Sequence, residues 1–231
     1  TMNSSSVVTR ATSLAAQAPS TPLSGVLGSS LRAAVLVMVV SGIAYPLLTT
    51  VVAQALFPQA AHGSLVERHG QVVGSSLIGQ AFSAAGYFHS RPSATTAPDP
   101  AHAGASVAAP YNAAASAASN QGATHQGLQD AVAQRVQDYR ATNGLAAHDR
   151  VPVDAVTASA SGLDPHISVA NASLQVPRVA RARGVTEAQV QQWVQQATEP
   201  RTLGLLGEPR VQVLQLNLAL DAHQAAAAAK E

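Results

Sequence analysis

One uninterrupted apolar stretch dominates the N-terminal quarter of the chain. Residues 33–57 are almost wholly apolar, and no Asp, Glu, Lys or Arg occurs from Ala33 to Val66. A helix of about 20 such residues crosses the hydrocarbon core of a bilayer, whereas a surface helix of a soluble protein carries a charged face. The pattern therefore predicts a transmembrane helix over residues 31–57.

A cleaved signal peptide is the alternative explanation of this stretch. Ala53-Gln54-Ala55 resembles a cleavage site, and cutting there would release a secreted binding protein. The apolar stretch is longer than the usual h-region of about 7–15 residues, which favours a retained anchor. Because Arg10 and Arg32 precede the helix and no acidic residue occurs before Glu67, the positive-inside rule places the N-terminus in the cytoplasm and residues 58–231 outside.

The predicted membrane helix has one unusual face. Pro46 has no N–H and frees the carbonyl of Gly42, which must be satisfied in another way inside lipid. Gly42, Thr49 and Ala53 fall on one side with Pro46, and small residues let a second helix approach closely. Either this face packs against the spans of partner proteins, or the helix is a kinked, lipid-facing anchor in which Thr49 or Thr50 bonds its own backbone.

Residues 58–231 show the pattern of one extracytoplasmic α+β domain with a small sheet and three to four helices. β-Branched residues and glycines over 71–80 indicate strand and turn, and alternation over 210–216 indicates another strand. Apolar residues spaced i, i+4, i+8 and i+11 from Leu128 predict a helix that Gly144 ends. The Ala-, Pro- and Ser-rich residues 94–122 are expected to form a functional or disordered loop.

Two further helices carry clear boundary signals. Ser168 is the expected N-cap of a helix over 169–183, which Pro177 should interrupt and Gly184 should end. Thr186 to Gln189 has the capping-box pattern and opens the last predicted helix.

Composition narrows the function classes. Charged residues make up 11% and aromatic residues 3%, and the net charge is +1, so no nucleic-acid partner is expected. Cysteine is absent, which excludes disulfides and thiolate zinc sites. Residues 1–30 are rich in Ser, Thr, Ala and Pro and are expected to form a disordered cytoplasmic tail, with Thr1 interpreted as a cloning remnant.

Catalytic motifs are sparse in this chain. The only lysine is Lys230, so a P-loop is excluded, and the H-E-x-x-H zinc motif is absent. Residues 157–168 contain Ser161, Asp164 and His166, which would suit a membrane-tethered extracytoplasmic serine hydrolase. A catalytic triad needs the serine within about 3 Å of a histidine that a carboxylate orients. The other interpretation is a Ser/Asp-rich turn that caps its own backbone.

Four blocks together resemble one family. They are SGIAYPLLTTVVAQALFP in the apolar helix, GSSLIGQAFSAAGYFHSRPSAT from Gly74, PVDAVTASASGLDPHISVANASLQVPRVARARG over 152–184, and VLQLNLALD over 213–221. In this order they resemble the C subunit of Kdp-type potassium-transporting ATPases. One departure is PYNAAASAASN, where the family often has a Gly-Gly-Ser-Asn run after Pro-Tyr-Asn.

The resemblance implies a single-pass, non-catalytic subunit of a four-subunit potassium pump in a bacterial inner membrane, with no cofactor of its own. In that family a P-type subunit hydrolyses ATP, a channel-like subunit binds potassium, and a small single-helix subunit completes the complex. The C subunit is described as an assembly factor and catalytic chaperone that raises the ATP affinity of the hydrolysing subunit. Because the predicted topology separates the domain from cytoplasmic ATP, coupling through the anchor or capping of the potassium entrance is easier to reconcile than direct nucleotide contact.

Candidate partner contacts are the small-residue face of the helix and the polar residues of the family blocks, each of which could equally serve the domain's own structure. They are Gly42, Pro46, Thr49, Ala53, Gln80, Arg91, Ser93, Asn112, Asn120, Asp164 and Arg178.

Overall fold

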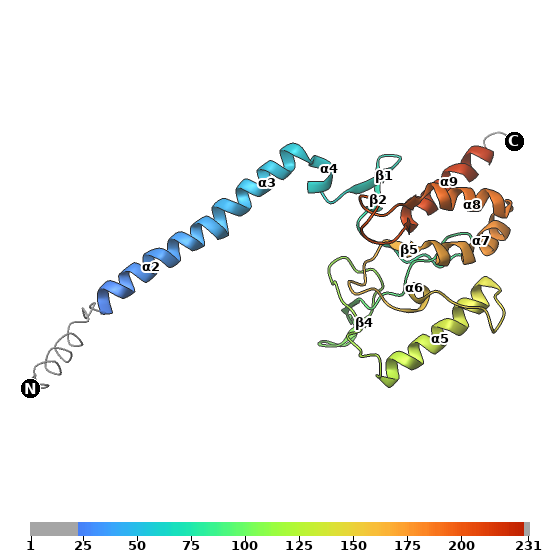
Figure 1. Ribbon diagram of the computed structural model, residues 1–231, viewed down its shortest axis with the longest axis horizontal. Coiled ribbons are helices and arrows are strands. Elements are labelled where there is room, and N and C mark those ends of the chain that lie inside the picture. Colours follow the sequence, from blue (N-terminus) through green and yellow to red (C-terminus); the bar gives the residue numbers. More distant parts are fainter. Residues whose placement is uncertain (1–22, 229–231) are drawn as a thin grey trace, which may run out of the picture. The chain divides into compact units, whose positions relative to one another are not determined.

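The structure is a computed structural model that describes residues 23–228 of the chain and divides it into two compact units between Ala61 and His62. The described part of the first unit is helical (Figure 1), with α2 at Leu23–Val39, a π-helical turn η1 at Val40–Ala44, α3 at Tyr45–Leu56 and α4 at Pro58–Ala61. Most of the predicted tail lies outside the described residues. From Leu23 onward the expectation of disorder is wrong, because apolar residues at helical spacing extend the helix toward the N-terminus.

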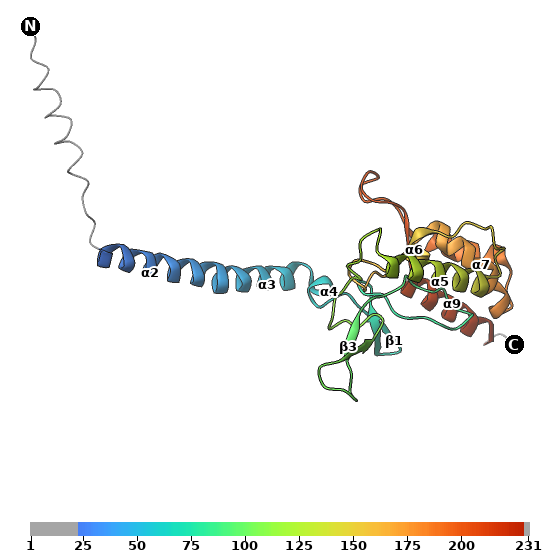
Figure 2. The ribbon, with the colours of Figure 1, turned by 90° about the horizontal axis from the view of Figure 1, so that it is seen from below.

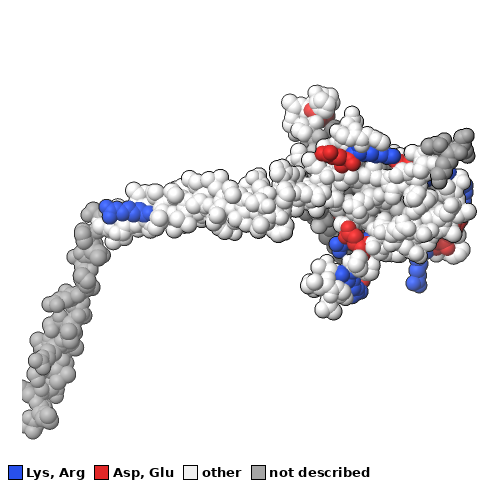
Figure 3. Space-filling model, turned by 90° about the horizontal axis from the view of Figure 1, so that it is seen from above, with Lys and Arg blue, Asp and Glu red and all other residues white. Residues whose placement is uncertain are grey.

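The predicted apolar helix is confirmed. Gly25–Leu56 is 32 residues long with a mean hydropathy of 2.2, so it is long and apolar enough to cross a membrane. At about 1.5 Å per residue it measures about 48 Å, which exceeds the ~30 Å hydrocarbon core. On the face that Figure 3 shows, the described part of this unit carries no charged side chain except a basic one near its start.

The helix changes its hydrogen bonding just before Pro46. The N–H of Tyr45 bonds the carbonyl of Val40, five residues back, so the wider π turn precedes the residue that has no donor. Thr49 Oγ1 lies 3.0 Å from the carbonyl oxygens of both Tyr45 and Pro46. Thr49 thus bonds its own backbone, as the lipid-facing alternative expected. Gly42 and Pro46 lie exposed along the same helix, so packing of this face against a partner helix stays a prediction.

The second unit is an α+β domain, as the sequence predicted, with three small antiparallel sheets (Figure 1). One hairpin joins β1 to β2, a second joins β3 to β4, and β7 lies between β5 and β6. The strands are β1 Leu65–Arg68, β2 Gln71–Ser75, β3 Thr96–Pro98, β4 Ser106–Ala108, β5 His166–Ser168, β6 Thr198–Glu199 and β7 Arg210–Gln212. The helices are α5 Gln126–Asn143, α6 Val153–Val156, α7 Val169–Arg183, α8 Glu187–Gln196 and α9 Val213–Ala228.

The helix boundaries follow the predicted caps. Gly144 and Gly184 end α5 and α7 with left-handed φ values of 68° and 67°, which glycine adopts without a Cβ penalty. Ser168 Oγ accepts from the N–H of Asn171, and Thr186 forms the full capping box at the start of α8. These local signals are confirmed.

Two predictions fail, and a third fails in part. α7 runs through Pro177 without a break, because the buried Val176 and Val179 on either side pack both halves into the core. The strand predicted over 210–216 ends at Gln212. From Val213 the chain is helical, because its apolar residues meet the core at helical spacing. The 94–122 loop contains the hairpin of β3 and β4, so the expectation of disorder is wrong there, whereas the expectation of a functional loop stays a prediction.

The core forms where α7, α8 and α9 pack with β5 and β7; Figure 1 labels the three helices and β5. α7 contributes Val176 and Val179, and α9 contributes Leu216 and Leu220. Phe88 is fully buried in this core although it belongs to no helix or strand. The segment around Phe88 therefore needs other partners for its backbone polar groups.

Candidate functional site

Buried polar side chains hold the irregular segment 85–89 against the core, and we call this arrangement the 85–89 clamp. The amide of Asn217 accepts from the N–H of Phe88 at 2.8 Å and donates to its carbonyl at 3.0 Å. The amide of Gln175 does the same to His89, at 2.7 and 3.2 Å. Both amides are 1% exposed. They replace the ladder that a neighbouring strand would supply, so the segment can be buried without being part of a sheet.

Arg178 completes the clamp from α7. Its Nη1 donates to the carbonyls of Ala85 at 2.6 Å and Tyr87 at 2.9 Å. Its Nε donates to Asn143 Oδ1, and its Nη2 donates to Gln175 Oε1. Burial lowers the pKa of Arg178 from its ordinary value, and all of these acceptors are neutral. The guanidinium thus joins α5, α7 and the 85–89 segment.

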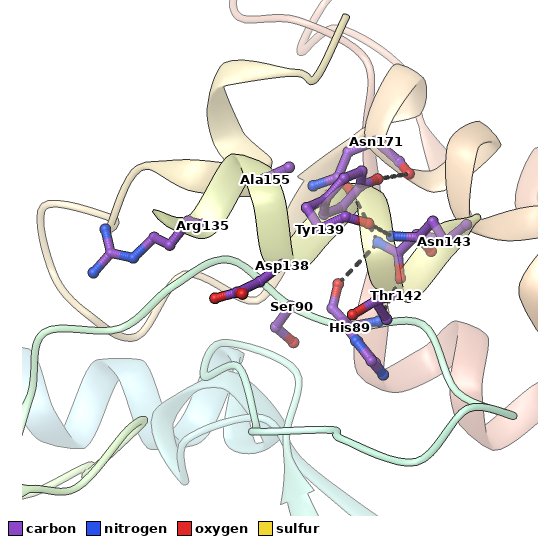
Figure 4. A pocket seen from close by; sticks show the side chains of 10 residues that line it. His89, Ser90, Arg135, Asp138, Tyr139, Thr142, Asn143, Ala155 and Asn171 are labelled. Carbon is purple, nitrogen blue, oxygen red and sulfur yellow. Dashed lines mark hydrogen bonds between the residues drawn. The ribbon is translucent and has the colours of Figure 1, made fainter. Parts of the chain in front are cut away.

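A cavity of about 210 Å³ lies beside this clamp (Figure 4), between α5, α7 and the 89–90 segment. Tyr139 donates to Asn171 Oδ1 at 2.9 Å, and burial raises the pKa of its hydroxyl. Burial, assisted by Arg178, lowers the pKa of His89. Arg135 and Asp138 also line the cavity. Most of its polar lining is therefore already engaged in internal bonds.

Asp221 anchors the segment from α9. It accepts from Arg183 at 2.9 Å, from Arg68 at 3.3 Å and from the hydroxyl of Tyr87 at 3.2 Å. Arg183 also bonds the carbonyl of Gly86. This carboxylate links β1, α7 and the 85–89 segment to one position on α9.

The predicted serine, aspartate and histidine do not assemble a triad. His166 Nδ1 faces Asp164 at 3.5 Å, but its Nε2 faces Glu199 at 3.6 Å. Ser161 Oγ instead accepts from the N–H of Leu163 at 3.1 Å. Burial alone would raise the pKa of Asp164, but hydrogen bonds from His166 and Arg91 lower it overall. The geometry fits a turn that caps its own backbone, which was the alternative interpretation.

Several predicted contact residues are brought together around this turn. Arg91 Nη1 lies 2.8 Å from Asp164 Oδ2, and Ser93 Oγ donates to the carbonyl of Gly162 at 2.7 Å. Gly162 has a φ of 69°, and a Cβ there would lie 2.5 Å from Thr95 Cγ2. The turn thus requires glycine where the second and third family blocks meet.

The side chains of the other predicted residues of the domain bond groups outside this turn or are exposed. Gln80 donates to the carbonyl of Val73, and Asn112 donates to that of Thr96. Asn120 is exposed with a φ of 53°.

The alanine-rich run that follows Asn112 is hydrogen-bonded to the rest of the domain. The N–H of Ala117 and the hydroxyl of Ser116 both donate to the carbonyl of Ser161, at 3.0 and 3.1 Å. Positive φ values in this segment fall on Tyr111 and Asn120 rather than on the alanines. The alanines therefore fit this backbone.

Sequence reasoning missed Gln175, Asn217, Asp154 and Asp221. Asp154 accepts from Ser168 and Asn171 and so fixes the start of α7. For Asn217 the available signal was a polar residue among the apolar residues of QLNLAL, residues 215–220, because a buried polar side chain needs a hydrogen-bond partner.

These features define a class of protein: an α+β domain that follows an apolar helix suited to membrane anchoring, with buried polar side chains that hold the domain's own loops. The family described as KdpC, the K+-transporting ATPase c chain, matches residues 27–222. The chain belongs to this family and is therefore a subunit of a potassium-transporting ATPase.

Curated relatives agree over most of their length. A potassium-transporting ATPase KdpC subunit of Rhodopseudomonas palustris (strain BisB18) is 57% identical over 182 residues, covering 79% of this chain and 90% of the relative. The KdpC subunit of Bradyrhizobium diazoefficiens is 56% identical over 182 residues, covering 79% and 89%.

Proposed function

We propose that this chain is a non-catalytic accessory subunit that helps an ATP-driven potassium pump to assemble and raises the ATP affinity of its separate ATP-hydrolysing subunit. The observation that carries the proposal is the family match, which runs from residue 27 to residue 222 and so includes both the apolar helix and the domain. One family model thus covers the helix and the domain together.

The arrangement of polar groups supports a binding role rather than hydrolysis. The guanidinium of Arg178 and the amides of Gln175 and Asn217 are used up in internal hydrogen bonds. His166 points its Nε2 at a carboxylate instead of a serine hydroxyl. These side chains thus stabilise the domain itself, and the turn offers no activated nucleophile.

In this proposal the helix is retained in a bacterial inner membrane, with the domain on the extracytoplasmic side. Arg32 near the helix start favours a cytoplasmic N-terminus. Gly42 lies within the π turn, and Pro46, Thr49 and Ala53 follow it; such turns are often found at functional positions of helices. This face would pack against helices of the P-type subunit, the channel-like potassium-binding subunit or the small single-helix subunit. ATP and potassium are bound by those partners, and the effect on ATP affinity passes through the anchor.

The test is an ATP titration of potassium-stimulated hydrolysis by the pump reconstituted with and without this chain. We expect the KM for ATP to rise when the chain is omitted and to fall again when the purified full-length chain is added. Recovery of the other subunits is measured in each sample, so that loss of assembly and loss of affinity are distinguished. An unchanged KM at equal subunit recovery contradicts the effect on ATP affinity.

A further inference from the structure

The loop between β6 and β7 exposes three leucines, and we call residues 201–208 the leucine loop. Leu203 is 87% exposed, Leu205 80% and Leu206 63%. The first two are the most exposed large hydrophobic side chains in the described part of the chain. Figure 2 shows the loop, dark orange, standing clear of the rest of the domain. Isolated apolar residues are normal on surfaces, but adjacent ones that project together mark an interaction site.

Internal bonds fix the shape of the leucine loop. Thr202 and Leu206 exchange two backbone hydrogen bonds, at 2.9 and 3.0 Å. Arg201 Nη2 lies 2.6 Å from Glu208 Oε2 across the base of the loop. The leucines are therefore held in one arrangement before any partner arrives, which lowers the entropy lost on binding.

The backbone of the loop is strained at a leucine. Leu203 has a φ of 55°, in the left-handed region where a branched side chain is disfavoured. The neighbouring left-handed positions carry glycine, at Gly204 and Gly207. Because the side chain of Leu203 is almost fully exposed, contacts within the domain do little to offset this strain. A contact outside the domain would offset it.

We propose that the leucine loop inserts into an apolar pocket on another subunit of the same ATPase. A protein partner is implied because the chain belongs to a family of ATPase subunits, and a projecting apolar tip fits a concave apolar site. The charges at the base of the loop pair with one another, Arg201 with Glu208 and Arg210 with Glu199 at 2.8 Å. They leave no excess positive charge to attract anionic lipid headgroups. This inference rests on the proposed function in one respect: the chain must be bound to the other subunits of the ATPase.

Photo-crosslinking in membranes that contain the whole pump tests the proposal. p-Benzoylphenylalanine is placed at Leu205 and, in a control chain, at Val153, which is 73% exposed in α6. We expect position 205 to form an adduct with one other subunit of the pump, identified by mass spectrometry, and position 153 to give none. Adducts at 205 only with lipid, only with a second copy of this chain, or no stronger than at 153 overturn the inference.

A variant series gives the size of the effect. In the triple variant Leu203→Ser, Leu205→Ser, Leu206→Ser we expect the chain to dissociate from the purified complex at least about tenfold faster than wild type, whereas Val153→Ser leaves the rate unchanged. Equal rates for the triple variant and wild type count against the proposal. If the wild-type chain recovers no other subunit, the proposed function fails as well. If it recovers them but the loop does not crosslink to one, only this inference is lost.

Discussion

Replacing Arg178 by leucine should remove four hydrogen bonds at once, to Asn143, Gln175 and the carbonyls of Ala85 and Tyr87. Leucine has no donor, and the site is closed to water because Arg178 is only 7% exposed. Each buried acceptor left without a donor costs about 1–3 kcal/mol. Part of this loss is offset because a cation no longer has to be buried. We therefore expect the free energy of unfolding to fall by about 4 kcal/mol, a large share of the ~5–15 kcal/mol typical of a domain.

The fluorescence of Trp193, the only tryptophan, reports this unfolding because its ring packs against the core. The full-length chain in detergent micelles is titrated with guanidinium chloride, and wild type and variant are compared at equal m-values. Arg181→Leu is the matched control, since Arg181 lies exposed on the same helix and should change stability by less than about 0.5 kcal/mol. If the free energy of unfolding of Arg178→Leu falls by less than about 1 kcal/mol, the reasoning is refuted, and the amides of Gln175 and Asn217 alone stabilise the 85–89 segment.

Three further predictions use the same chain. Asp221→Asn removes the charge shared by two arginines and a tyrosine, and should lower the free energy of unfolding by about 2 kcal/mol in the fluorescence titration; a change within about 0.5 kcal/mol contradicts this. Because burial, with Arg178, lowers the pKa of His89, the unfolded chain binds the proton first, so stability should fall as pH drops below about 6.5. Titrations at several pH values should show a shallower loss in His89→Gln, and identical slopes would count against it. Gly42→Leu should reduce the recovery of other pump subunits from membranes relative to Leu47→Ala, and equal recovery would argue that this face meets lipid.

Local signals in the sequence were enough to predict most helices. Gly144, Gly184, Ser168 and Thr186 act within a few residues of their own positions, so their roles can be derived from neighbouring residues. The apolar helix needs only length and the absence of charge. These features do not depend on how the rest of the chain folds.

Tertiary packing decided the features that the sequence left open. Residues 213–216 alternate in a way that suits either a strand or a helix, and contact with the core selected the helix. The role of Asn217 depends on which distant segment folds onto α9, and residue spacing does not show that Phe88 lies there. Sequence reasoning singled out both Arg91 and Asp164, and they form an ion pair. Closeness in sequence did not place Ser161 beside His166, because the turn directs their side chains to different partners.

The most direct test of the account is purification of the affinity-tagged, full-length chain from native membranes in mild detergent. The account predicts that the chain keeps its apolar helix and is recovered with the other subunits of a potassium-stimulated ATPase. Recovery of a soluble, solitary chain that lacks residues 1–55 would contradict it.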